Sequence, residues 1–137
     1  MGETKYYFAK VEPNDGVEGL SSGRMFALQE AISWAKRRKL ERTTAVRISI
    51  SNDKGDTLLT DSELDEFLSS RRLSNLAWNT FAASFLLTLL VRGFDLPPPL
   101  FGFCFGLSAL ALLGGVIPSA QLVVIGNKAS QRDRKGN

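Results

Sequence analysis

The 137-residue chain has no histidine and only one cysteine, Cys104. The usual side-chain sets for nucleophilic catalysis and for zinc binding are therefore missing. The chain also lacks a glycine-rich phosphate loop, and the acids of DSELDEF (61–67) do not follow the spacing of a calcium loop. We therefore expect no enzyme, with no catalytic residues, no metal site and no cofactor. A single cysteine also excludes an internal disulfide, so the redox compartment is not indicated.

Charge is nearly absent from a long part of the second half of the chain. All but two of the 17 basic and 14 acidic residues lie in residues 1–72 or 128–137. The apolar stretches 73–91 and 100–117 each approach the roughly 20 residues that cross a hydrocarbon layer about 30 Å thick. Buried helices of a soluble protein are the alternative, but the rest of the chain is too small to cover two of them. We expect two transmembrane helices, and no charge inside them marks a transport path.

Three consecutive prolines separate the two apolar stretches. Residues 92–99, RGFDLPPP, cannot continue a helix, so they predict a short loop between two antiparallel membrane helices. The second helix is expected over residues 100–125, which would be about 39 Å long and would exceed the hydrocarbon layer. Pro118 marks where this excess is resolved. The helix either kinks and tilts there, or it ends and leaves residues 119–127 at the interface.

Basic residues flank the apolar stretches on one side. They are Arg71 and Arg72 before the first stretch and Lys128, Arg132, Arg134 and Lys135 after the second, whereas the loop offers only Arg92, close to Asp95. Lysine and arginine near the ends of spans favour the cytoplasmic side. We also expect no secretory signal. The sequence predicts an integral protein of the bacterial inner membrane, with both termini cytoplasmic and residues 126–137 as a basic tail.

Small residues recur at helical spacing in both apolar stretches. Helices in a membrane associate through close packing of small residues and through hydrogen bonds. The expected helix-packing residues are Gly102, Gly106 and Ala109 on the second helix and Thr80, Ser84 and Thr88 on the first. We favour contact between these two stripes within one chain. The alternatives are that they join separate chains or line a polar path.

Residues 1–72 have the patterns of a small cytoplasmic α+β domain. Strands are predicted over 6–11, 44–51 and 56–60, and helices over 24–40, with Ser22 as N-cap, and from 61 to about 70. The resulting element order is β-α-β-β-α. The stretch NDKG predicts a turn between the last two strands.

The second predicted helix of this domain begins with the clearest local signal in the chain. Thr60 and Glu63 fit a capping box, and Leu59 and Leu64 stand at the two positions of a hydrophobic staple. The acids in its first turns suit the positive end of the helix dipole. Toward the membrane, this helix either continues into the first apolar stretch or breaks near Ser74.

A cluster of basic residues ends the first predicted helix. The basic patch comprises Lys36, Arg37, Arg38, Lys39 and Arg42, together with Arg71 and Arg72 before the first apolar stretch. A membrane surface is the favoured partner, because the patch is tethered to the bilayer. An acidic protein is an alternative. Nucleic acid is not expected, because no reader motif accompanies the patch and the domain is neutral overall.

These features favour a non-enzymatic accessory or scaffold protein anchored in a lipid bilayer. Its small domain would contact a partner protein, in the membrane or the cytoplasm, or the membrane surface. The alternative function is an oligomeric pore former or holin-like effector, which the two spans, the charged tail and the small-residue stripes permit. The two hypotheses differ in their partner, since the second needs only further copies of this chain.

Overall fold

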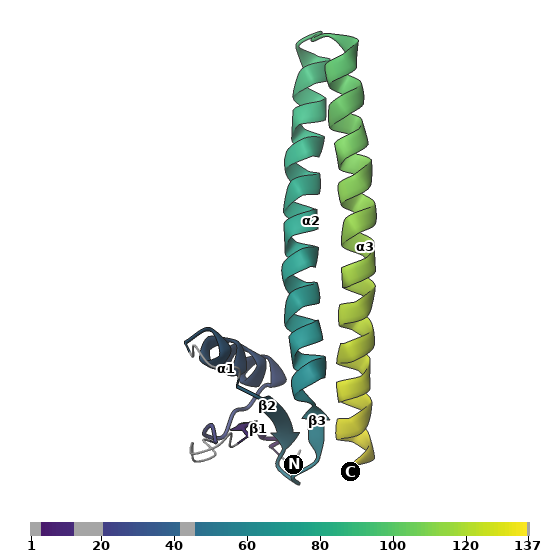
Figure 1. Ribbon diagram of the computed structural model, residues 1–137. Helices are drawn as coiled ribbons and strands as arrows, with labels where there is room; N and C mark the ends of the chain where they lie inside the picture. Colours follow the sequence, from purple (N-terminus) through teal and green to yellow (C-terminus); the bar gives the residue numbers. More distant parts are fainter. Residues whose placement is uncertain (1–3, 13–20, 42–45, 137) are drawn as a thin grey trace. The chain divides into compact units, whose positions relative to one another are not determined.

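A small strand-containing region precedes two long apolar helices, and this coarse arrangement confirms the sequence prediction. The computed structural model describes residues 4–12, 21–41 and 46–136. Its elements are β1 (Tyr7–Val11), α1 (Leu28–Glu41), β2 (Ile48–Asn52), β3 (Thr57–Leu59), α2 (Asp61–Gly93) and α3 (Pro98–Lys135) (Figure 1). The chain divides into two compact units. Unit 1 contains Met1–Leu68 and Ile125–Asn137, and unit 2 contains Ser69–Val124.

Unit 1 is built on a three-stranded antiparallel sheet in the order β1-β2-β3. The register pairs Ala9 with Ile50 and Val11 with Ile48, so alternate residues of β1 and β2 place their apolar side chains on one face. A bulge between Ile50 and Ser51 shifts the pairing of β2 with β3. The core of this unit includes Ala9, Val11, Ile48, Ile50, Leu58, Leu59 and Leu64, all at most 5% exposed.

Helix α1 packs against β1 and β2 through one face. Ala31, Ile32 and Ala35 are buried on it, at the three- and four-residue spacing of an amphipathic helix. The helix begins four residues later than predicted, because Met25 pairs with Tyr7 at the edge of β1 instead of starting the first turn. Ser22 therefore does not cap the helix. Its hydroxyl accepts a hydrogen bond from the Ala9 amide at 2.9 Å.

The β2–β3 turn forms where NDKG predicts it. The Asn52 side-chain oxygen accepts hydrogen bonds from the amides of Lys54 at 3.2 Å and Asp56 at 2.8 Å. Gly55 has φ +88°, a conformation that side chains disfavour. Asn and Gly therefore supply the local bonding and the backbone freedom that the turn requires.

Helix α2 runs from Asp61 to Gly93 without a break, so Ser74 does not cap a new helix. It ends in a short loop in which Asp95 has φ 50°, a left-handed conformation that aspartate tolerates better than most residues. Helix α3 starts at Pro98, because a proline in the first turn loses no helical hydrogen bond. It continues past Pro118 to Lys135, which excludes the predicted alternative that it ends at Pro118.

In unit 2 the two helices run antiparallel and share a seam of small and polar residues. From the outer end toward the loop, Ser70 bonds Gln121, Ser74 bonds Ser119, and Ser84 bonds Ser108, each at 2.9 Å. The seam residues recur every three or four positions, as Ser74, Ala77, Phe81, Ser84, Thr88 and Val91 on α2 and as Cys104, Ser108, Ala111, Gly115 and Pro118 on α3. This spacing keeps one face of each helix turned toward the other.

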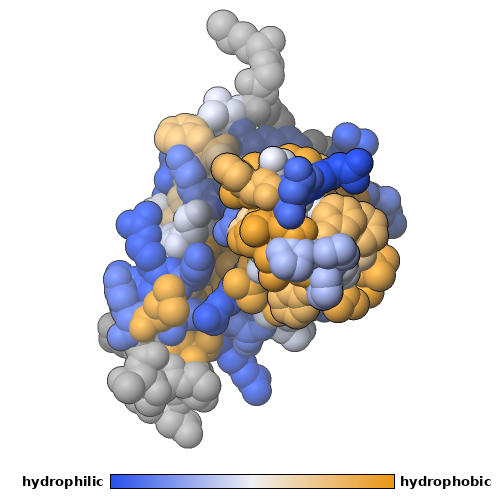
Figure 2. Space-filling view, turned by 90° about the horizontal axis from the view of Figure 1, so that it is seen from above, coloured by the Kyte–Doolittle hydropathy of each residue, from blue (hydrophilic) through white to orange (hydrophobic). Residues whose placement is uncertain are grey.

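Large apolar side chains lie on the outside of this helix pair. Leu110, Phe103 and Ile117 are 66–69% exposed, and most other leucines and phenylalanines of the pair are exposed as well. Figure 2, which looks onto the end that carries the loop, shows apolar side chains in orange around the helices. Both helices are long and apolar enough to cross a membrane, judged by length and composition.

Candidate functional site

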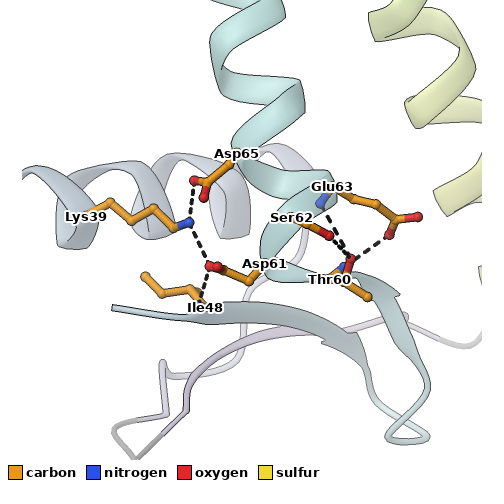
Figure 3. A network of polar contacts seen from close by, with 7 residues as sticks. All are labelled: Lys39, Ile48, Thr60, Asp61, Ser62, Glu63 and Asp65. Carbon is orange, nitrogen blue, oxygen red and sulfur yellow. Dashed lines mark hydrogen bonds and ion pairs between the residues drawn. The ribbon is translucent and has the colours of Figure 1, made fainter. Parts of the chain in front are cut away.

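The first turns of α2 carry three carboxylates that bind groups from other elements of unit 1. We call Asp61, Glu63 and Asp65 the acidic turn (Figure 3). Thr60 caps the helix as predicted, since its amide donates to Glu63 Oε2 at 3.1 Å and its hydroxyl accepts from the Glu63 amide at 3.5 Å. Capping positions this turn directly after β3. The same carboxylates are therefore free to face α1, β2 and the end of α3.

Lys39 of α1 ties the first helix to the acidic turn. Its ammonium group donates to Asp61 Oδ1 at 2.7 Å and also binds Asp65. The same Asp61 oxygen accepts the backbone amide of Ile48, at the start of β2, at 2.8 Å. A single carboxylate thus joins the C-terminal part of α1, the first residue of β2 and the first turn of α2.

The protonation of this junction follows from its contacts. Burial opposes ionisation of Asp61, but the hydrogen bonds from Lys39 and from the Ile48 amide outweigh it and lower the Asp61 pKa. Burial likewise opposes the charge on Lys39, yet its two carboxylate partners raise the Lys39 pKa. Both groups are therefore charged at neutral pH, as a bonded ion pair requires.

Glu63 binds the other end of the chain. Two guanidinium nitrogens of Arg132 on α3 donate to the two Glu63 oxygens at 2.7 and 2.9 Å, which is the bidentate geometry of a strong ion pair. Arg132 also donates to the Leu58 carbonyl of β3 at 3.0 Å. The hydrogen bond from Arg132 lowers the Glu63 pKa and raises that of Arg132.

Further contacts attach the end of α3 to unit 1. We call residues 125–136 the C-terminal segment. Asp133 accepts hydrogen bonds from Lys5 at 3.0 Å and from the Tyr7 hydroxyl at 3.4 Å. Lys54, in the β2–β3 turn, donates to the Gly136 carbonyl at 2.7 Å. The sequence predicted a basic tail for these residues, whereas the structure shows a helix whose last turns contact the sheet region.

The predicted basic patch is partly consumed by internal contacts. Lys39 is held by the acidic turn, and Arg38 lies over the Trp34 ring at 5.3 Å and pairs with Glu41 at 3.6 Å. Lys36 and Arg37 are exposed, and no ion pair of theirs is seen in the described part of the chain. Arg42 lies outside the described residues. Arg71 and Arg72 are exposed on α2 in unit 2.

The remaining exposed face of α1 combines charge with an apolar side chain. Lys36, Arg37 and Leu40 share one side of the helix by their spacing, and Leu40 is 76% exposed. This face is smaller and less charged than the sequence predicted. Lysine 39 turns inward because residues 32, 35 and 39 follow the buried stripe, a consequence of helical periodicity that the charge count alone conceals.

The predicted helix-packing residues separate into two groups. Ser84 and Thr88 are 4% and 7% exposed and lie on the seam, whereas Thr80 bonds the Leu76 carbonyl of its own helix. A side-chain carbon added at Gly102 or Gly106 would meet nothing within 4 Å, and Ala109 is exposed. These three residues of α3 therefore do not pack against α2 within the chain.

The contacting residues of α3 were missed by the sequence prediction. They are Cys104, Ser108 and Gly115, and a carbon added at Gly115 would touch the Trp78 ring at 3.4 Å. The signal was present as small residues recurring every three or four positions, but the pair Gly102 and Gly106 drew attention to the neighbouring face. The Ser84 to Ser108 hydrogen bond marks the correct one.

The arrangement joins elements and offers no reactive group. In residues 4–12, 21–41 and 46–136, no set of three or more His, Cys, Asp or Glu side chains is placed to hold a metal ion. The carboxylates of the acidic turn are each engaged by a cation or an amide. Their chemistry is that of charge-assisted hydrogen bonding between secondary-structure elements.

Similarity to known proteins adds no assignment to this geometry. No protein-family model matches the chain, and neither a curated protein nor a solved structure is significantly similar to it.

Proposed function

We propose that this chain is an integral membrane protein whose two long helices form a transmembrane hairpin and whose small domain acts as an accessory or scaffold module on the cytoplasmic side. The observation that carries the proposal is the polarity of the helix pair. Its seam holds serine, threonine, alanine and glycine, while its outer surface holds leucine, phenylalanine, isoleucine and valine.

This polarity is the reverse of a helix pair folded in water. Only 22% of the most apolar stretch of α2 and 17% of that of α3 are buried, so these helices do not resemble the core of a soluble protein. Exposed apolar area of this size is unfavourable in water, at roughly 25 cal/mol for each Å². In hydrocarbon the same surface carries no such penalty, and small residues then favour close helix contact.

The lengths of the helices support spans with extensions. At 1.5 Å per residue, the 33 residues of α2 and the 38 residues of α3 extend about 50 and 57 Å, more than a hydrocarbon layer of about 30 Å. The uncharged stretches 73–91 and 100–117 are the parts that fit inside it. The ends at Asp61 and Lys135 then lie in water.

The composition of unit 1 supports a common side for both ends of the chain. Glu63 follows the sheet in sequence and Arg132 follows both apolar stretches, yet they form one bidentate pair. A contact of this kind requires that the chain return to the side from which it left. The excess of lysine and arginine on that side favours the cytoplasm.

The small domain offers a surface for a partner. The face of α1 with Lys36, Arg37 and Leu40 is exposed and suits either an acidic protein surface or the head-group layer of the membrane. No reactive cluster accompanies it in the described residues, which favours binding over catalysis. We therefore propose a scaffold or accessory role.

An oligomeric pore former is the second candidate. It is favoured by the open side of Gly102 and Gly106, where a neighbouring chain could approach closely because nothing lies within 4 Å. In that case the stripe joins separate chains, which is one of the alternatives that the sequence left open.

Labelling of single cysteines tests the topology. In a Cys104→Ala background, Lys10→Cys and Ser130→Cys should react with a membrane-impermeant maleimide only in inverted vesicles, and Asp95→Cys only in intact cells. Reaction of Asp95→Cys and Ser130→Cys from the same side would exclude the hairpin. A monodisperse protein without detergent would exclude the membrane assignment.

Membrane potential separates the two functions. Induced expression should leave the potential intact if the chain is an accessory protein, and a partner should co-purify in fixed ratio. Rapid depolarisation that Gly102→Leu and Gly106→Leu abolish would establish the pore former instead. Ala109→Leu is a further variant on the same face, and Leu110→Met is the matched control.

A further inference from the structure

The last residues of α3 belong to the same compact unit as the first 68 residues, although unit 2 separates them in sequence. We propose that the C-terminal segment is the closing element of the small domain, so that the sheet and the first turns of α2 reach native stability only after residues 125–136 have docked. With two membrane spans, as proposed above, the domain then matures only in chains whose second helix has returned to the cytoplasmic side.

The first step concerns the edge of the sheet. Strand β3 pairs with β2 on one side only, and an edge strand presents unpaired backbone groups. Arg132 donates to the carbonyl of Leu58, in the middle of β3, at 3.0 Å. The C-terminal segment therefore satisfies an edge group of a strand that is only three residues long.

The second step concerns the acidic turn. Glu63 already bonds the Thr60 amide, and Arg132 binds both of its oxygens. The pair is well formed because its planar groups meet in a fork, which holds the side chains more strongly than a single contact. One arginine thus fixes β3 and the start of α2 together.

The third step concerns the spread of the contacts. Besides Arg132, Asp133 binds Lys5 and Tyr7 next to and within β1, and the Gly136 carbonyl binds Lys54 in the β2–β3 turn. The segment also buries Ala129, which is 1% exposed. It contacts the start of β1, the turn and β3, which are parts of the sheet that lie far apart in sequence.

Order of synthesis gives these contacts a consequence. The residues that receive them are complete once residue 68 has been made, whereas the residues that donate them are the last of the chain. A domain that needs both cannot close early. Its exposed binding face on α1 is then presented on a stable support only by a fully inserted chain.

Hydrogen exchange on the full chain in detergent tests the closing role. Arg132→Gln should raise the exchange rates of the β2 and β3 amides about tenfold, as loss of hydrogen bonds to charged groups implies. Arg132→Lys should recover part of the protection. The amides of residues 76–91 and 101–117 serve as an internal reference and should not change.

Arg134→Gln is the matched control, because Arg134 lies two residues away on the same helix and is exposed. Strand exchange in Arg132→Gln at the wild-type rate would overturn the proposal. So would an equal increase in Arg134→Gln, since that result would attribute the effect to net charge. Neither result depends on the membrane assignment, which the cysteine labelling tests separately.

The timing is tested on the full chain held on the ribosome through linkers of two lengths. A short linker keeps the C-terminal segment inside the exit tunnel, and a long linker releases it. Residues 1–68 should resist protease only with the long linker, and the Arg132→Gln chain should stay sensitive with both. Resistance with the short linker would overturn the proposal.

Discussion

The two units of this protein use opposite arrangements of polar and apolar side chains. Unit 1 encloses Ile48, Ile50 and Leu64 at 0% exposure and places its ion pairs around them. Unit 2 encloses hydroxyl groups, such as those of Ser84 and Ser108, and exposes its leucines. The same backbone chemistry is satisfied in both, so the difference identifies the solvent that each unit is made for.

The comparison also explains where charge is used. Unit 1 carries printed ion pairs from Lys39 and Arg132 to the acidic turn, and water can solvate their outer sides. In unit 2, the helix contacts in the described residues are made by small side chains and neutral hydrogen bonds. Charge inside hydrocarbon is costly, whereas hydroxyl groups can bond within their own helix as well as across it.

The largest expected effect comes from the core of unit 1. Ile50→Ala should destabilise this unit by about 2 to 5 kcal/mol, because a fully buried side chain leaves a cavity. Hydrogen exchange on the full chain in detergent should show rapid exchange in β2 and β3 with the helix pair still protected. Leu110→Ala, at an exposed position of α3, is the control and should leave the protection of β2 and β3 unchanged. Equal loss of protection in both variants would contradict the opposite arrangement of the two units.

A charge on the outside of unit 2 gives the next largest effect. Leu110 is 69% exposed, and in water Leu110→Lys would change stability by less than about 0.5 kcal/mol. In a bilayer the same change near the centre of a span should cost about 3 kcal/mol. Glycosylation mapping of helix insertion in microsomes measures this difference.

Leu40→Lys supplies the matched test in unit 1. Leu40 is 76% exposed on α1, so this variant should unfold at the wild-type temperature within a few degrees. A large cost at position 40, or none at position 110, would remove the distinction between a unit made for water and a unit made for lipid.

Local signals were sufficient for much of unit 1. The alternation of Ile48 and Ile50, the NDKG turn and the capping box of Thr60 and Glu63 each depend on residues close in sequence, and all are present in the structure. The N-terminus of α1 was misplaced because Met25 pairs with β1, and strand pairing across a loop leaves no local pattern.

The contacts of the acidic turn could not be predicted from sequence. Lys39 and Asp61 are 22 positions apart, and Glu63 and Arg132 are 69 apart. Nothing in one sequence selects these partners from 17 basic and 14 acidic residues. Capping accounted for the acids by itself, so their second role in joining α1, β2 and α3 remained hidden until the fold brought those elements together.

Acid should weaken unit 1 before unit 2. The pKa values of Asp61 and Glu63 are lowered in the folded state, so their stabilisation is present above their unfolded values of about 3.9 and 4.3 and is lost as pH falls through the folded values. We expect a loss on the order of 1 kcal/mol in exchange-derived stability of the strands. The seam of unit 2 should keep its protection over the same range, because its hydroxyl groups do not titrate there.

Glu63→Gln checks the cause of this pH dependence. The amide keeps the shape of the side chain but cannot gain a proton in acid, so the variant should start less stable and lose less on acidification. A variant with the wild-type slope would assign the effect to other carboxylates. Asp53→Asn is the control, since Asp53 lies in the β2–β3 turn and outside the acidic turn.

The smallest expected effect belongs to the seam of unit 2. Ser84 and Ser108 share a hydrogen bond at 2.9 Å, and Ser108 also bonds the Cys104 carbonyl of its own helix at 2.9 Å. Because that second acceptor stays available, a double-mutant cycle of Ser84→Ala and Ser108→Ala should give a coupling of only about 0.6 kcal/mol. Steric trapping in bicelles measures it, with Thr80→Ala as the uncoupled control. A coupling above about 2 kcal/mol would mean that the hydroxyl groups have no other partner, and the seam would then depend on this bond more than on the close approach of small residues.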